Sequence, residues 1–120
     1  MKVSVKGSQD GSWGLTQSHI SNADYHGATE KWLAKHGPST VMAFVQFNGV
    51  SIDEQPRVYI ATLKEVAVRL KESTSERGET ILYESHTWGP RAFAAGTTDE
   101  IPKSWGFSQQ RIEDIFAMIG

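Results

Sequence analysis

Residues 40–47, "TVMAFVQF", are the stretch that most limits what this chain can fold into. The run is apolar and begins with β-branched residues, which favours a strand. It is also far too short to span a bilayer. We therefore expect 40–47 to be a central strand that is buried on both of its faces.

Other segments also have the composition of strands. Residues 2–7 and 12–17 flank Asp10-Gly11, a dipeptide that favours the tight turn of a β-hairpin. In the first of these segments Val3 and Val5 alternate with polar residues, so we expect the valines to face the core. The remaining predicted strands are 57–61 and 80–85.

Three segments carry helix signals. The first ends before Gly37, a natural C-cap that is followed by proline. Thr62 and Glu65 form a capping box at the start of the second helix. The third begins after Ser108, and its predicted buried stripe is Ile112, Ile115, Phe116 and Ile119. Together the elements predict a single α/β (α+β) domain over residues 1–120, in which a mixed sheet of about five strands packs with about three helices.

The composition excludes several kinds of site. The 120 residues include no cysteine, which rules out disulfides, cysteine-based zinc sites and a thiol nucleophile. Lys and Arg number 12 against 14 Asp and Glu, a net charge of −2, whereas a general nucleic-acid binder has a basic excess. The first ten residues lack the apolar core of a signal peptide. We expect a cytoplasmic protein that has no membrane segment.

Ser4 and Lys6 lie two residues apart on the first predicted strand, so their side chains project from the same face. In one well-known nuclease arrangement, an acidic residue and a lysine at this spacing hold a divalent metal and help to generate the attacking water. Serine stands at the acidic position here, and it is a poor magnesium ligand beside a carboxylate. The alternative is that Lys6 is an ordinary solvated lysine on the polar face of the strand.

The wider sequence resembles the second half of the restriction-endonuclease-like (PD-(D/E)XK) superfamily. The order "VSVKGSQDGSWGL", a helix, "VMAFVQFNG" and "PRVYIATLKEVAVRL" is similar to that of prokaryotic members. In those members a lysine strand, a strand that begins with tryptophan and a strand–helix pair follow one another. The resemblance covers residues 3–72. It implies that Lys6 is the motif lysine, which would be catalytic, with Mg²⁺ or Mn²⁺, only if the chain is a nuclease.

The chain departs from the superfamily in one respect. The family core begins with a helix and a strand that bears an aspartate, and neither has a counterpart before the lysine strand here. We expect a truncated, catalytically incomplete core that exposes surface normally covered by the missing helix. Such a surface favours self-association, so we expect a homo-oligomer, with a protein or nucleic-acid partner left open.

Residues 86–106 lack clear periodicity and exceed the usual loop length, which suggests either function or a further strand near 91–96. Aromatic side chains with an arginine on a loop can stack a base or line a small-molecule pocket. Alternatively, the aromatic residues close one end of the core and the arginine pairs with a carboxylate. No histidine spacing typical of a metal site occurs, so we predict no metal ligands and no cofactor. The candidate binding residues are His86, Trp88, Arg91 and Phe93.

The predicted function is a non-catalytic binding or interaction module built on a truncated nuclease-like core. The first alternative is a metal-dependent nuclease or nuclease subunit, which uses Lys6 with acidic residues from elsewhere or from a partner chain. The second alternative is a small-molecule-binding domain that uses the 86–96 loop.

Overall fold

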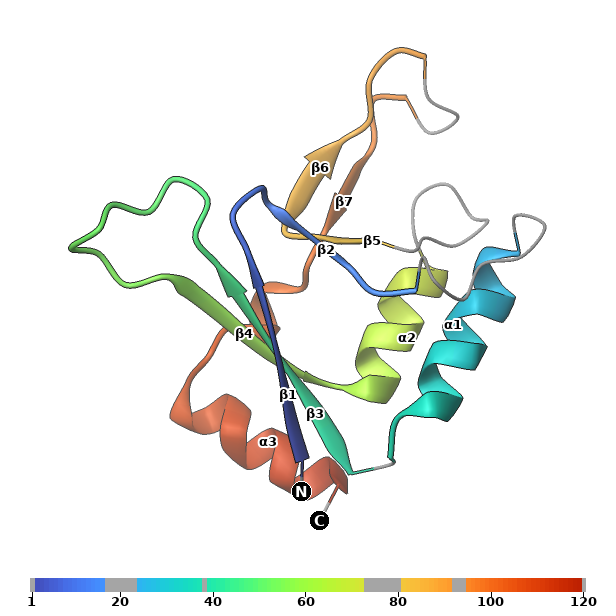
Figure 1. The fold of residues 1–120 in the computed structure, drawn as a ribbon, viewed down its shortest axis with the longest axis vertical. Helices are drawn as coiled ribbons and strands as arrows, with labels where there is room; N and C mark the ends of the chain where they lie inside the picture. Colours follow the sequence, from blue (N-terminus) through green and yellow to red (C-terminus); the bar gives the residue numbers. More distant parts are fainter. Residues whose placement is uncertain (1, 17–23, 38, 73–80, 92–94, 120) are drawn as a thin grey trace.

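Figure 1 shows the computed structural model, which describes residues 2–16, 24–37, 39–72, 81–91 and 95–119. The mixed α/β fold class predicted from the sequence is confirmed. The helices are α1 Tyr25–Lys35, α2 Leu63–Lys71 and α3 Gln109–Ile119, with a 3₁₀ turn, η2, at Lys103–Trp105. The strands are β1 Lys2–Ser8, β2 Ser12–Gly14, β3 Thr40–Gln46, β4 Arg57–Thr62, β5 Ile81–Tyr83, β6 Ser85–Thr87 and β7 Thr98–Glu100.

Among the described residues, β3 is the middle strand of a mixed sheet in the order β1-β3-β4. It runs parallel to β1 and antiparallel to β4. Every residue of β3 except Val45 is buried, which confirms the central strand predicted from 40–47. Successive side chains point to opposite faces of a strand. Met42 and Phe44 therefore join one core cluster, whereas Val41 and Ala43 join another.

Helices α1 and α2 cover the face of the sheet that carries Met42 and Phe44 (Figure 1), which we call the closed face. Trp32 of α1 and Val66 and Leu70 of α2 are buried in the same cluster. Because two helices and β2 contribute to this cluster, Met42 and Phe44 are both fully buried.

The start of α2 is fixed by the predicted capping box, which is confirmed. The hydroxyl of Thr62 accepts a hydrogen bond from the backbone N–H of Glu65 at 3.2 Å. In return, Oε1 of Glu65 accepts from the backbone N–H of Thr62 at 2.9 Å. Both donors would otherwise lack a partner at the first turn, so the helix begins where β4 ends.

Helix α3 packs on the opposite face of the sheet, which we call the open face (Figure 1). Ile115 is buried there against Val41, Ala43 and Ile60. The predicted stripe of α3 is correct in part: Ile112 and Ile119 are partly buried, whereas Phe116 is 51% exposed.

The predicted hairpin between the first two strands is wrong. The turn at Asp10-Gly11 does form, with Gly11 at a φ of +86°, but β1 pairs with β3, and β2 pairs antiparallel with β5. Trp13 of β2 supplies the physical reason. Its ring packs on Phe44 with centroids 5.3 Å apart, so β2 leaves the plane of the sheet to enter the core of the closed face.

The valines of β1 also differ from the prediction. Val3 is 52% exposed and Val5 is 63% exposed, although their alternation predicted burial. Both lie on the open face, because they align with Val41 and Ala43 of β3. Helix α3 packs on β3 and β4 through Ile115 and leaves these two valines uncovered.

The expected sheet of about five strands is divided. Besides β1-β3-β4, the described residues form two separate pairs, β2-β5 and β6-β7. The segment 86–106 contains part of β6, all of β7 and η2, so it is more ordered than its sequence predicted. Around the possible strand at 91–96, the described residues 91, 95 and 96 lie in turns, and 92–94 lie outside the described residues. In the part of the chain described here, no helix combines the length and apolar character needed to cross a membrane.

Candidate functional site

Lys6 lies near the end of β1, on the closed face. Lys6 aligns with Phe44 of β3, and Ser4 aligns with Met42. Both side chains therefore lie on the face of the sheet that carries these two core residues. Lys6 is exposed, and it lines a hollow of about 290 Å³ at the β1–β2 turn together with Asp10. The spacing thus places Ser4 and Lys6 on one face, next to a turn that carries a single carboxylate among the residues lining the hollow.

Asp10 is engaged in holding the turn. Its Oδ1 accepts hydrogen bonds from the hydroxyl of Ser8 at 2.8 Å and from the backbone N–H and hydroxyl of Ser12, both at 3.1 Å. The Ser8 bond, followed by those of Ser12, holds the pKa of Asp10 below its ordinary value. No group of three or more His, Asp or Glu side chains that could hold a metal ion occurs within the described ranges. Mg²⁺ or Mn²⁺ at Lys6 stays a prediction.

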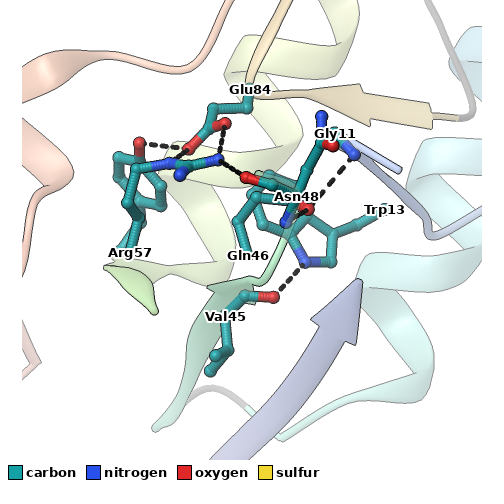
Figure 2. Close-up of polar contacts among 8 residues, drawn as sticks. Gly11, Trp13, Val45, Gln46, Asn48, Arg57 and Glu84 are labelled. Atoms are coloured by element: carbon teal, nitrogen blue, oxygen red, sulfur yellow. Dashed lines mark hydrogen bonds and ion pairs between the residues drawn. The ribbon is translucent and has the colours of Figure 1, made fainter. Parts of the chain in front are cut away.

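The turn is fastened to the end of β3 by a buried amide, as Figure 2 shows. Oε1 of Gln46 accepts from the backbone N–H of Gly11 and from that of Asn48, each at 3.1 Å. The indole N–H of Trp13 donates to the carbonyl of Val45 at 3.3 Å. Gln46 is fully buried, so these bonds replace water that its carbonyl oxygen would otherwise bind. These bonds therefore hold the β1–β2 turn, whose residues line the Lys6 hollow, against the end of β3.

A second polar group joins β4 to the segment between β5 and β6 (Figure 2). Arg57 donates two hydrogen bonds to the carboxylate of Glu84, at 2.7 and 2.9 Å, and one to the carbonyl of Asn48 at 2.9 Å. The hydroxyl of Tyr59 donates to the same carboxylate at 2.6 Å. The bonds from Arg57 hold the pKa of Glu84 below its ordinary value. Burial, with the bond to Glu84, raises the pKa of Tyr59 to about 12.

His86 and Trp88, two of the predicted binding residues, do come together. The His86 ring stacks on Tyr83 with centroids 4.6 Å apart, and it meets the edge of Trp88 at the same distance. The Trp88 indole N–H donates to Asp99 at 2.8 Å, and Asp99 also forms an ion pair with Arg69 at 2.8 Å. All three rings are half-buried, so they form a partly exposed aromatic cluster between the end of β5 and the β6–β7 hairpin.

Of the other two candidates, Arg91 is not brought into this cluster. Arg91 is exposed in the turn that follows Trp88, and no hydrogen bond, ion pair or ring contact links it to another of the described residues. Phe93 lies outside the described residues. Among the described candidates, His86 and Trp88 therefore lie together, with the Trp88 indole bonded to Asp99, and Arg91 lies apart from them. Ligand binding by these residues stays a prediction.

A third site was missed at the sequence level. It is the apolar surface formed by Val3, Val5, Phe107 and Phe116, each at least half exposed. Val3 and the two phenylalanines line a hollow of about 260 Å³ between α3 and the sheet, and every residue that lines it is apolar. The sequence gives these residues the periodicity of buried positions. No local signal could show that α3 stops short of β1.

Comparison of the chain with family models, curated proteins and solved structures found no match. The resemblance to the restriction-endonuclease-like superfamily therefore stays a prediction.

Proposed function

We propose that this chain is a non-catalytic interaction module that binds another protein through the apolar surface of Val3, Val5, Phe107 and Phe116. The observation that supports this function is the clustered exposure of these large side chains along β1 and α3. Scattered apolar residues are normal on a protein surface, but a contiguous group of this kind is typical of an interaction site.

The shape of the surface agrees with this function. Aromatic residues are enriched at protein interfaces, and two of the four residues are phenylalanines. The hollow beside them, about 260 Å³, is large enough to receive an apolar side chain of a partner. Binding energy usually concentrates where such an anchor enters a desolvated pocket. The floor of the hollow includes Val41 and Ile60, which the core holds in place.

The test is a photo-crosslinking amino acid placed at Phe116, in living cells that produce the chain. We expect covalent adducts with protein from this position, identified by mass spectrometry. The matched control is Val68, which is similarly exposed at 48% but lies on α2, across the sheet. Equal labelling from both positions, or no adduct from Phe116, would contradict the proposal.

The nuclease alternative makes a different prediction. It requires cleavage of labelled DNA or RNA that depends on Mg²⁺ or Mn²⁺ and is lost in Lys6→Ala. Lys6 is exposed and does not belong to either core cluster, so we expect this variant to keep the fold. Metal-dependent cleavage that disappears in Lys6→Ala would replace the interaction module by a nuclease.

The small-molecule alternative depends on the aromatic cluster of Tyr83, His86 and Trp88. Stacked rings that are partly exposed can accept a planar ligand. A small-molecule binder of this kind is stabilised against heat by its ligand. His86→Ala should reduce this stabilisation, and Arg91→Ala should reduce it only if the arginine contacts the ligand.

A further inference from the structure

Strand β1 is an edge strand of the central sheet. At the other edge, the chain after η2 runs along β4: the N–H of Phe107 donates to the carbonyl of Val58 at 2.9 Å, and Tyr59 and Gly106 form a bridge. No strand or loop of the described residues pairs with the outer side of β1. A free edge is a template for pairing with another strand.

The hydrogen bonds at the two ends of β1 show which of its groups face outward. The N–H of Lys2 donates to the carbonyl of Ser39, and the carbonyl of Ser8 accepts from the N–H of Phe47. Both bonds are on the β3 side. Because backbone groups alternate in direction along a strand, the even residues bond to β3. The N–H and C=O groups of the odd residues, Val3, Val5 and Gly7, therefore point away from the sheet.

We propose that a second copy of this chain pairs antiparallel with this edge, with Val5 opposite Val5 of the second copy. This inference rests on the proposed interaction function and names the partner. β1 runs from Lys2 to Ser8, and Val5 is its central residue, so this register uses the whole strand. It places Val3 opposite Gly7 of the second copy. All the outward backbone groups of both strands then form hydrogen bonds.

The two lysines of β1 select this register. With Val5 at the centre, Lys2 faces Ser8 of the second copy and Lys6 faces Ser4 of the second copy. A slip of two residues, which puts Ser4 at the centre, would place Lys2 directly opposite Lys6 of the second copy. Like charges directly opposite each other are destabilising. Edge lysines commonly prevent unwanted pairing, and here they disfavour the shifted pair while permitting the centred one.

The apolar surface becomes continuous in this dimer. The two-fold axis of the strand pair runs perpendicular to the sheet, so the open faces of both copies lie on the same side. The exposed Val3 and Val5 of each copy meet those of the other along the shared strands, and Phe107 and Phe116 flank them. Pairing between the two β1 strands would thus cover both the outward backbone groups of β1 and its exposed valine side chains.

The first test compares two substitutions at Val5 by analytical ultracentrifugation over a range of concentrations. Val5→Pro removes an outward N–H, which an edge strand tolerates, so β1 stays paired with β3. Val5→Thr keeps the N–H and the β-branched shape. We expect wild type and Val5→Thr to form a dimer of 13.3 kDa chains, and Val5→Pro to dimerise at least about tenfold more weakly, because each dimer loses two hydrogen bonds.

The second test uses the absence of native cysteine. In the centred register Val5→Cys places two thiols directly opposite, about 5.5 Å apart at Cα, within reach of a disulfide. Val3→Cys is the matched control, with similar exposure, but its two thiols lie about 13 Å apart. We expect a disulfide-linked dimer from Val5→Cys under mild oxidation and none from Val3→Cys.

These outcomes separate the inference from the proposed function. A wild-type chain that stays monomeric, or a Val3→Cys crosslink stronger than that of Val5→Cys, would overturn the dimer. If Phe116 still crosslinked to a different protein in cells, the interaction function would stand with another partner. If Phe116 gave no adduct but the β1 dimer were confirmed, the interaction would involve β1 without the apolar surface around Phe116.

Discussion

The closed and open faces of the β1-β3-β4 sheet share the same strands but are covered very differently. On the closed face, α1, α2 and β2 bury Met42 and Phe44 completely. On the open face, Ile115 of α3 packs with Val41 and Ala43, whereas Val5 and its neighbours are exposed. The closed face carries the larger buried apolar cluster, and the open face has exposed apolar side chains.

The two faces also differ in the polar contacts that hold their covering elements in place. The buried Gln46 fastens the β1–β2 turn at the closed face. The guanidinium of Arg111, on α3, donates one hydrogen bond to the carbonyl of Ile60 at 3.1 Å and another to the carboxylate of Glu65 at 2.7 Å. One buried arginine therefore connects α3 to the end of β4 and to the start of α2.

The largest expected effect is on the closed face. Phe44→Ala removes a fully buried ring that packs against Trp13, so we expect a loss of about 3–5 kcal/mol in the free energy of unfolding. Urea unfolding followed by tryptophan fluorescence measures it. A loss below about 1 kcal/mol would mean that this face is not the main core.

Next in size is the link between α3 and the sheet. Arg111→Leu removes one bond to a carbonyl and one charge-assisted bond to Glu65, which should cost about 1–3 kcal/mol. The control is Gln110→Leu, at an exposed position of the same helix, which should stay within about 0.5 kcal/mol. Equal effects of both substitutions in urea unfolding would show that Arg111 does not fix α3.

A smaller, pH-dependent effect is expected at Glu84, beside Tyr59 at the rim of the closed face. Its pKa is lower in the folded chain, chiefly through Arg57, so its stabilisation is complete above the unfolded value near 4.5. The stabilisation disappears as the pH falls through the lower folded pKa. Glu84→Gln should cost about 1 kcal/mol at pH 7, since Arg57 is partly exposed.

The measurement for Glu84 is the difference in unfolding free energy between wild type and Glu84→Gln, taken at neutral pH and then stepwise into acid. This difference should shrink as the pH falls. A difference that is constant or that grows in acid would contradict the sign of the pKa shift.

The smallest effect on stability is expected on the open face. Phe116→Ala makes the same kind of truncation as Phe44→Ala, but at a half-exposed ring, so unfolding should change by less than about 1 kcal/mol at concentrations where the chain is monomeric. The same substitution should reduce association through the apolar surface. If it destabilised the monomer as much as Phe44→Ala, the two faces would not differ in the way described.

The elements of the fold could largely be predicted from local patterns. The capping box at Thr62 and Glu65, the apolar run of β3 and the turn at Gly11 each depend on residues close together in the sequence. The pairing of β2 with β5 could not be predicted, since it depends on Trp13 entering a core that distant helices complete.

The candidate sites divide in the same way. The spacing of Ser4 and Lys6 placed them on one face, whereas the composition of 86–96 drew attention to His86 and Trp88 without predicting that their rings are in contact. Their roles stay predictions. The apolar surface was not predicted, because alternation shows only that the valines of β1 share a face and not whether anything covers that face.

The sequence by itself determined where the three helices and the strands β1, β3 and β4 form, because those choices depend on backbone propensity, capping and periodicity within a few residues. Only the tertiary structure decided which apolar residues are buried. Burial depends on how far α3 extends over a sheet whose edge strand, β1, lies about 100 residues earlier in the chain. Val3, Val5 and Phe116 have the sequence periodicity of buried residues, but this long-range packing leaves them exposed.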